Sequence, residues 1–403
     1  MIERPVNHAH AIFGPQSSAR RGACPTLDAP MRTGDGLLAR IRVVGSVISP
    51  DQLSGLAELA TEHGNGLVEV TARGNLQVRG LRPETAPPFA TAVARLLTVE
   101  TGLVVDTSPL AGLDPHEIID PAPLARQLRA DAAPFAARLG PKVSVVVDGG
   151  GQISLATFKA DIRLTALGKD HWAVALGGGK PQQMDTDSAL AAAIALLGAL
   201  AAIGPEARAT DLFPVRDARA EPSPAVLARS LADGADRLRL RDGHTIPIAL
   251  PFGQVHGAIL IALMEAAQID GITNIRLAPD HCLLLDNASP ALIRRAAALG
   301  FITDPGDPRR RVSACIGNQG CASGHIAARD IAARLAPQLH AHQQLHVSGC
   351  AKGCAHPRPA HVTLVGTADG IGLVINGRAG DTPEQFLDEA ALAAALVSSQ
   401  DRR

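Results

Sequence analysis

Aromatic side chains are scarce in this sequence, whose 403 residues include no tyrosine, one tryptophan and eight phenylalanines. A platform for stacking nucleic-acid bases needs several exposed rings, so this composition argues against one. An excess of charge of either sign is also lacking, because 38 Lys and Arg residues balance 39 Asp and Glu residues. The chain as a whole therefore has no attraction to nucleic acid or to an anionic membrane surface, and an anionic ligand must be met by a local group of cations.

Long apolar runs and targeting signals are lacking as well. The longest apolar candidate, residues 189–203, is rich in alanine and falls short of the roughly 18 to 20 residues that span a bilayer. The N-terminal residues have neither the charged start nor the apolar stretch of a signal peptide. No Gly-x-Gly-x-x-Gly fingerprint follows an expected strand, which argues against a nicotinamide- or flavin-binding domain. We expect a cytoplasmic protein with no membrane segment and no nucleic-acid partner.

Four of the six cysteines lie in two pairs: Cys315 with Cys321, and Cys350 with Cys354. Neighbouring Gly and Ala residues place these thiols on short loops. Four thiolates are the usual ligand set of a [4Fe–4S] cluster. Structural zinc also takes four cysteines, but its paired ligands usually have two to four intervening residues, a gap that Cys315 and Cys321 exceed. We predict a cluster, with zinc, disulfides or plain core cysteines as the alternatives.

The two remaining cysteines, Cys24 and Cys282, are isolated in the sequence. A free cysteine without a partner behaves as a small buried hydrophobe, and we expect both to do so. Thiols that are kept available for iron also fit a reducing cytoplasm.

A chain of this length is too long for one ordinary core, and its expected elements repeat. A strand over 37–44, a helix over 50–63, a hairpin over 67–80 and a helix near 87–98 form a first unit, A. The same order returns over 244–299 as unit A′, with a helix expected from Val255 to Gln268. Such a repeat indicates gene duplication and two halves that pack about a pseudo-twofold axis.

The start of the first helix carries the most specific local signal. Ser49 is a good N-cap, Pro50 suits the first helical position, and Gln52 can complete a capping box. Gly64 follows as the expected stop.

A second kind of unit, B and then B′, follows each copy of the first, so that the chain reads A, B, A′, B′. Only B′ carries the paired cysteines. Where B′ has the sequence Gly-Cys-Ala-Lys-Gly-Cys over 349–354, B has Asp-Gly-Gly-Gly over 148–151. The sequence therefore predicts that only the second copy holds a cluster.

The two A units differ in charge. The first strand and hairpin of A carry six polar side chains that we take as candidate ligand-binding residues: Arg40, Arg42, Arg73, Asn75, Gln77 and Arg79. The matching strand of A′ has no arginine, and its hairpin has Asp280 and His281. We infer a pocket between the halves to which one half supplies cations and the other thiolates, suited to a ligand with several carboxylates. The alternative is that Arg40, Arg42 and Arg79 are solvated strand residues.

The A-B-A′-B′ order, with Cys-x5-Cys and Cys-x3-Cys in B′, resembles the siroheme and iron–sulfur nitrite and sulfite reductase superfamily over about residues 20–380. Segments 20–26, 31–38 and 71–80 are most similar to its cobalamin-pathway members, the precorrin-3B synthases. The resemblance implies an α+β fold with a duplicated architecture, in which two ferredoxin-like half-domains pair about a pseudo-twofold axis beside two mixed α/β cluster-type domains. The implied divisions are an N-terminal arm 1–21, half-domain A 22–106, domain B without cysteines 107–180, a helix and linker 181–237, half-domain A′ 238–303 and iron–sulfur domain B′ 304–403.

The same resemblance assigns roles to individual residues. Cys315, Cys321, Cys350 and Cys354 would ligate the cluster. Arg73 and Gln77 would contact tetrapyrrole carboxylates, and Arg40 would line the distal cavity as a catalytic residue. Arg42, Asn75 and Arg79 complete the substrate-binding set together with Lys142.

Lys142 occupies the position of the first of two active-site lysines in the reductases and is the second catalytic candidate. The position of the second lysine holds Ser144, and no distal arginine is found over 102–106. Sulfite reduction needs such cations to bind an oxyanion and to deliver protons, so their loss favours another reaction in the same pocket.

The resemblance thus implies a monooxygenase of aerobic cobalamin biosynthesis, which hydroxylates precorrin-3A at C20 with O₂ and forms a γ-lactone. A reduced nicotinamide would be the ultimate electron donor, directly or through a partner protein, and a mononuclear non-haem iron would accompany the cluster. His346, His356 and His361 lie near the cysteine loops, but lone histidines are more often structural than ligands. The alternatives are a siroheme-dependent sulfite or nitrite reductase, a non-catalytic iron–sulfur electron carrier and a zinc-stapled scaffold.

Overall fold

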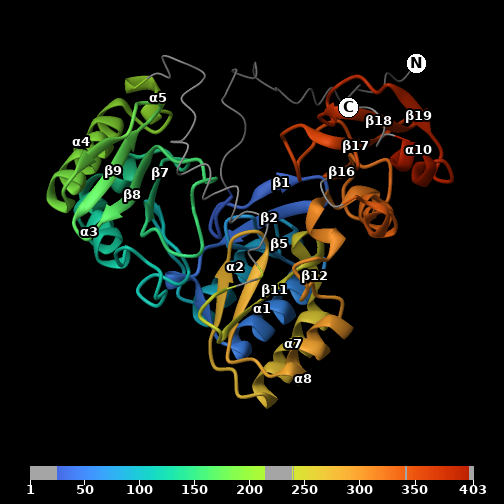
Figure 1. Ribbon diagram of the computed structural model, residues 1–403, viewed down its shortest axis with the longest axis horizontal. Coiled ribbons are helices and arrows are strands. Elements are labelled where there is room, and N and C mark those ends of the chain that lie inside the picture. Colours follow the sequence, from blue (N-terminus) through green and yellow to red (C-terminus); the bar gives the residue numbers. More distant parts are fainter. Residues whose placement is uncertain (1–24, 214–237, 239, 341–342, 399–403) are drawn as a thin grey trace, which may run out of the picture.

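The computed structural model describes residues 25–213, 238, 240–340 and 343–398. Units A and A′ form a central body, with B on one side and B′ on the other (Figure 1). The predicted arm 1–21, Cys24 and residues 214–237 of the predicted linker lie outside the described residues. The division of the chain at the expected boundaries stays a prediction.

The central body contains two antiparallel sheets. The first has the order β1 (Met31–Thr33), β2 (Gly36–Ile41), β5 (Leu76–Leu81), β4 (Leu67–Val70) and β12 (Gln254–His256). The second has the order β11 (Thr245–Ala249), β14 (Cys282–Asp286), β13 (Ile275–Ala278) and β3 (Val47–Ile48). Every neighbouring pair in both sheets runs antiparallel.

Each central sheet takes its last strand from the other half of the chain. β12 follows β11 in sequence but pairs with β4, and β3 follows β2 but pairs with β13. A short 3-10 turn with left-handed backbone precedes each of these strands, at Gly45 (φ 66°) in one half and at Phe252 (φ 54°) in the other. The expectation that a helix begins at Val255 was therefore wrong, because Val255 lies in β12 and the helix begins at Gly257. A strand of only three residues is too short to show the alternation of apolar and polar residues that would reveal it in the sequence.

Four helices cover the two central sheets: α1 (Pro50–His63), α2 (Ala86–Leu96), α7 (Gly257–Ile269) and α8 (Pro290–Ala298). The expected capping box is confirmed, since the Ser49 side chain accepts from the Gln52 backbone and the Gln52 side chain accepts from the Ser49 backbone. α1 and α7 pack against each other, and Leu56 and Leu263 belong to one hydrophobic core that both halves share.

The two flanking sheets have the same topology. The sheet of B also includes β6 and β10, which lie just outside 107–180, and its order is β10 (Gln182–Met184), β9 (His171–Leu176), β8 (Ile162–Gly168), β7 (Ser144–Asp148) and β6 (Val104–Asp106). In B′ it is β19 (Gln385–Leu387), β18 (Gly370–Gly377), β17 (Ala360–Thr367), β16 (Leu345–Ser348) and β15 (Val312–Ala314). The first three strands of each unit in chain order run parallel, the fourth runs antiparallel to the third, and the fifth runs antiparallel to the fourth.

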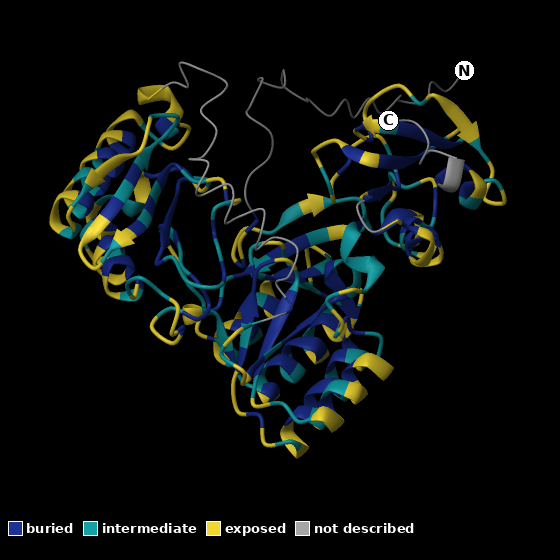
Figure 2. Ribbon diagram, viewed as in Figure 1, coloured by how far each residue is buried: buried dark blue, intermediate teal, exposed yellow. Residues whose placement is uncertain are grey.

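Helices pack on these sheets in matching places. B has α3 (Ala122–Ala132), a 3-10 helix over Ala133–Arg138, α4 (Thr186–Ile203) and α5 (Ala209–Leu212), and B′ has α9 (Ala328–Leu335), a 3-10 helix over Ala336–Gln338 and α10 (Leu392–Ser398). Figure 2 shows buried strands inside each lobe and exposed residues on the outer helix faces. This mixture of sheets and helices confirms the α+β fold.

The helix α4 is longer than the apolar run read from the sequence. It begins at Thr186, and its 18 residues are long and apolar enough to cross a membrane by length and composition alone. Its buried residues, among them Ala193, Leu197 and Leu200, belong to the hydrophobic core of B. It also contacts α3 and β9. These contacts are those of a helix that packs into the core of a domain.

Candidate functional site

A cavity of about 1090 Å³ opens where A, A′ and B′ meet. Unit A contributes one wall from β2, β4, β5 and the turn after β4, and A′ contributes residues near the ends of β11 and β13. B′ contributes the largest share, including all four paired cysteines: Cys315, Cys321, Cys350 and Cys354. Only Thr157 comes from B among the lining residues.

The four thiols face the cavity from two loops of B′. Cys315 directly follows β15, and Cys350 and Cys354 lie in the loop after β16. The backbone N–H of Gly349 donates a hydrogen bond of 3.0 Å to the Cys315 Sγ, which joins the two loops. Burial, and then the charges of the three other thiols, raise the pKa of Cys354, so the four sulfurs lie within electrostatic reach of one another.

Two glycines leave room for these sulfurs. A Cβ on Gly34 would lie 2.3 Å from the Cys321 Sγ, and one on Gly349 would lie 2.9 Å from the Cα of Gly317. The turn of A that contains Gly34 is also tied to the cysteine loop, because the Ala322 N–H donates to the Gly34 carbonyl. Unit A therefore closes over the cysteine loop at contact distance.

The four thiols form a donor set of the kind that a polynuclear cluster uses. Within the described residues, no three His, Cys, Asp or Glu side chains are arranged to hold one metal ion. Four sulfurs around one zinc would lie roughly 3.8 Å apart, the edge of a tetrahedron with Zn–S bonds of about 2.3 Å. A four-iron cluster spreads its thiolate ligands over separate corners and accepts N–H hydrogen bonds at sulfur. Cys282 is only 3% exposed within β14, as expected of a buried hydrophobe.

A polar network covers the floor of the cavity on the sheet of A. The Arg40 guanidinium donates two hydrogen bonds to the Gln77 Oε1, at 3.0 and 2.8 Å. The Gln77 Nε2 donates in turn to the Glu69 Oε2 at 2.6 Å. Because each side chain holds the next one, Arg40 keeps a fixed position at the cavity wall.

Arg79 is fixed by a second carboxylate. Its Nε and Nη2 donate to the two oxygens of Asp35 at 2.8 and 2.9 Å. Burial opposes the charge on Arg79, but these bonds and the charge of Glu69 outweigh burial and raise its pKa. Burial likewise opposes the negative charge of Asp35, and Arg79 still lowers the pKa of that carboxyl. Both groups stay ionised, so Arg79 presents a fixed positive charge.

Most cations of the cavity come from B′, and none of these B′ residues was predicted from the sequence. They are Arg309, Arg310, Arg311, Arg329, Lys352 and Arg358. The hypothesis that one half supplies cations and the other thiolates was therefore wrong. A run of three arginines ordinarily indicates a solvated surface, and only the fold turns the 3-10 helix Pro308–Arg311 toward the cavity.

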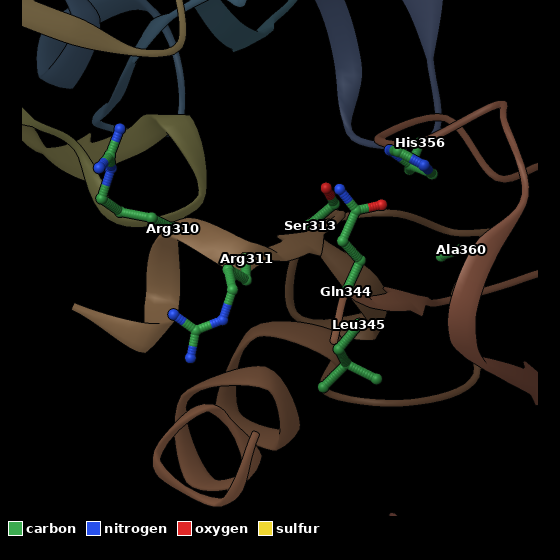
Figure 3. A pocket seen from close by; sticks show the side chains of 7 residues that line it. All are labelled: Arg310, Arg311, Ser313, Gln344, Leu345, His356 and Ala360. Atoms are coloured by element: carbon green, nitrogen blue, oxygen red, sulfur yellow. The ribbon is translucent and has the colours of Figure 1, made fainter. Parts of the chain in front are cut away.

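A smaller hollow of about 70 Å³ adjoins the cavity and shares Arg310, Arg311, Ser313, Gln344 and His356 with it. Figure 3 shows that Arg310 and Arg311 point to different sides although they are neighbours in sequence. The Gln344 amide lies beside Ser313 in the same view. The arginine run therefore places positive charges at separate points around the cavity.

Of the seven residues predicted to bind the substrate, three line the cavity: Arg40, Gln77 and Arg79. Four others are not among the described lining residues: Arg42, Arg73, Asn75 and Lys142. Arg73 donates to Asp106 at 2.8 Å and to the Lys159 carbonyl, and it lies over the Phe158 ring at 4.9 Å. Arg42 donates to the Gly102 carbonyl at 3.3 Å, and Lys142 lies in the segment before β7. Arg73 therefore connects A to B in this structure, and Arg42 contacts the segment before β6.

The three candidate histidines lie on one side of the B′ sheet. His346 is fully buried, and burial lowers its pKa to about 4, so it is neutral. Its Nδ1 lies 3.1 Å from the Ser313 carbonyl, and its ring centroid is 5.6 Å from that of His356. Only His356 lines the cavity, while the His361 Nδ1 accepts from the Gln344 backbone at 3.2 Å. The structural role that we expected of these histidines stays a prediction.

The equivalent loops of B hold carboxylates instead of thiols. Asp148 accepts from the backbone of Gly150 and Leu155 at 3.0 and 3.1 Å. Asp114 accepts from the backbone of His116 and from both the backbone and the side chain of Gln152. These carboxylates accept from backbone N–H groups of the two loops, and residues 107–180 contain no cysteine.

Comparison with known proteins agrees with this architecture. The family model for the "Nitrite/Sulfite reductase ferredoxin-like half domain" matches residues 29–96. A precorrin-3B synthase from Sinorhizobium sp is 38% identical, over 95% of this chain and 89% of the relative. The chain belongs to the precorrin-3B synthase family.

That family lies within the nitrite and sulfite reductases. A ferredoxin–nitrite reductase from Synechococcus elongatus is 22% identical over 85% of this chain and 80% of the relative. A ferredoxin-linked sulfite reductase from Mycolicibacterium paratuberculosis is 26% identical over 84% of this chain and 72% of the relative. The structure of the Mycobacterium tuberculosis NirA protein matches 91% of this chain and 81% of that one with a TM-score of 0.63 at 18% identity, which confirms the fold.

Proposed function

We propose that this chain is a precorrin-3B synthase-like monooxygenase of cobalamin biosynthesis. Its substrate would be precorrin-3A, hydroxylated at C20 with closure of a γ-lactone. One oxygen atom of O₂ would enter the product and the other would leave as water, with two electrons from a reduced nicotinamide, directly or through a donor protein. The observation that carries the proposal is that four thiols and eight basic side chains line one cavity.

The cavity suits a large polyanion. Its volume of about 1090 Å³ is at the upper end of the roughly 300–1,000 Å³ found for small-molecule sites. Arginine binds carboxylates through two parallel hydrogen bonds, and several arginines at the rim match a macrocycle with many acetate and propionate groups. We assign carboxylate binding to Arg309, Arg310, Arg311 and Arg358.

The remaining roles follow from the contacts of each side chain. Arg40, held by Gln77, would orient the ligand over the floor of the cavity. Cys315, Cys321, Cys350 and Cys354 would hold a [4Fe–4S] cluster, which supplies one-electron transfer when it is bound. Arg73 would act at a distance from the ligand by keeping B against A through Asp106. Arg42, Asn75 and Lys142 receive no substrate contact in this proposal.

The test is anaerobic purification, iron and sulfide counts, and mass analysis of the product from precorrin-3A, O₂ and a reductant. We expect four irons per chain from the cluster, a fifth if a mononuclear iron accompanies it, and a product that has gained one oxygen atom, taken from isotopically labelled O₂. An acid-extractable siroheme with a Soret band would instead support a sulfite or nitrite reductase. Zinc without iron and sulfide would support a zinc-stapled scaffold, and a cluster without product formation would support an electron carrier.

A further inference from the structure

Four polar side chains form a row across the central sheet of A. Arg40 on β2 pairs with Gln77 on β5, which pairs with Glu69 on β4, which pairs with Gln254 on β12. Directly opposite residues in an antiparallel sheet project from the same face, with Cβ atoms about 4.5–5.5 Å apart. The exchanged strand β12 therefore brings a residue of A′ beside a row that faces the cavity.

Glu69 is the acidic member of this row, and three donors surround its carboxylate. The Gln77 Nε2 donates to Oε2 at 2.6 Å. The Arg79 Nη1 and the Arg329 Nη2 lie 3.8 and 3.9 Å from Oε1. Only 14% of the Glu69 side chain is exposed. We call the three groups of Gln77, Arg79 and Arg329 the anion cradle.

Two donors of the anion cradle, Arg79 and Gln77, are also held by groups other than Glu69. Asp35 holds Arg79 through two hydrogen bonds, and Arg40 holds Gln77 through two more. Arg329 belongs to the first turn of α9 and is largely buried, and burial is the main cause that lowers its pKa. Without Glu69, Arg79 would keep its bonds to Asp35, and Gln77 would keep its bonds to Arg40.

Gln254 gives a second, independent sign of a polar site beside the cradle. The residue is 5% exposed, and neither its Oε1 nor its Nε2 has a hydrogen-bond partner among the described residues. The Nε of Arg329 is buried without a described partner as well. Buried polar groups without partners are rare, and these two lie next to the same carboxylate.

We propose that Glu69 is a specificity-determining residue, a carboxylate of the protein itself that fills an anion cradle otherwise able to bind a small inorganic oxyanion. A second small anion would meet the negative charge of Glu69 at close range in a partly buried site, where charges interact more strongly than in water. Small oxyanions such as nitrite are thereby kept out of the inner cavity. A large polycarboxylate is still admitted, because its anionic groups reach Arg309, Arg310, Arg311 and Arg358 at the rim.

This inference deepens the proposed function and rests on it only for the identity of the large ligand. It explains how a cavity rich in arginine avoids competition from abundant small anions. Its test uses no tetrapyrrole, so failure of hydroxylation and failure of this inference are separate results.

The test measures the binding of nitrite and of formate, a redox-inert anion of similar shape, to anaerobically purified protein with its cluster by titration calorimetry. The wild-type protein and Glu69→Asp, which keeps the charge, should show no saturable binding at millimolar anion. Glu69→Ala should bind both anions at least about tenfold more tightly, because the anion takes the place of the carboxylate beside the Arg79 and Arg329 guanidinium groups and accepts from Gln77. Glu69→Ala combined with Arg329→Met should lose that gain.

Thermal unfolding provides a second measurement on the same variants. Formate should raise the melting temperature of Glu69→Ala and of Glu69→Gln and leave the wild-type value unchanged. If Glu69→Ala does not fold, Glu69→Gln removes the charge and keeps the shape, and it should bind anions more tightly than the wild-type protein. The inference is overturned if the wild-type protein binds nitrite as tightly as the neutral variants, or if neither variant gains binding.

Discussion

Units B and B′ share a strand order and differ in what their loops hold. After β7, Asp148 turns back to accept from the backbone of its own loop, and Asp114 does the same for the neighbouring loop. After β16, the loop instead presents Cys350 and Cys354 to a cavity. In B the carboxylates bond to the backbone of the loops, whereas in B′ the thiols line a cavity. The sheet thus fixes where two loops meet, and a few side chains decide whether the meeting point can hold a cofactor.

The largest expected effect comes from removing one thiol of B′. Cys350→Ser should lose cluster iron and abolish product formation, because a four-iron cluster needs all four thiolates. Iron and sulfide counts on anaerobically purified protein measure the loss. The matched control is Cys282→Ala, which removes a thiol buried in β14 and should retain full iron. Full iron in Cys350→Ser would show that this thiol is not a ligand.

The next largest effect concerns the arginines of B′. Arg311→Met should raise the KM for the tetrapyrrole about 10- to 100-fold, since a charge-assisted hydrogen bond contributes about 1.5–3 kcal/mol. Iron content should not change. Arg334→Gln in the same unit is the control, because Arg334 forms an exposed ion pair with Glu389 that should matter little. Equal KM values for the two variants would remove Arg311 from the binding site.

A smaller effect is expected in the loops of B. Asp148→Ala should lower the free energy of unfolding by about 2–4 kcal/mol, because two backbone N–H groups lose an ionised acceptor. Chemical denaturation measures the change, and iron content should stay at the wild-type level. In B′ the residue at the matching place, Ser348, donates to the Cys350 carbonyl, so Ser348→Ala should affect iron content more than Asp148→Ala does.

The smallest effect is a pH dependence confined to B. Burial, reinforced by Asp114, Asp120 and Asp148, raises the pKa of Glu117 from 4.5 to about 7 against a hydrogen bond from Gly112. A carboxyl whose folded pKa is raised contributes stability below its unfolded pKa and loses it as pH rises through about 7. Glu117→Gln should therefore be more stable than the wild-type protein above neutral pH, by about 1 kcal/mol because half of the group is exposed.

Melting temperatures between pH 5 and pH 8.5 measure this difference, which should vanish toward pH 5. A difference that is constant with pH would assign the effect to packing and not to titration.

Local signals in the sequence predicted the elements that are held by short-range contacts. The capping box of Ser49 and Gln52 and the stop at Gly64 involve neighbours in sequence, and the structure confirms them. The cysteine spacing predicted which residues meet at one cavity, since loops that follow adjacent parallel strands lie at the same sheet edge. The repeat of unit order predicted the α+β fold.

Features that depend on distant pairing were not predictable from sequence. β3 has two residues and β12 has three, and each finds its partner only in the other half of the chain. Arg329 and the arginine run before β15 read as solvent-facing helix residues until the fold turns them toward a cavity. Glu69 fits the alternating pattern of β4 like any other strand residue. Its proposed role depends on the guanidinium groups of Arg79 and Arg329 that lie beside it.

The exchange of β3 and β12 between the two halves of the chain bears on how the chain evolved. If the halves arose by duplication, a single-copy ancestor with the same edge strand could have completed its sheet only by lending that strand to a second identical chain. Fusion would then have tethered two subunits that were already interlocked. After fusion, one copy could lose its thiols and the two copies could diverge in sequence. Each half was still stabilised, because a strand from the other half completes its sheet.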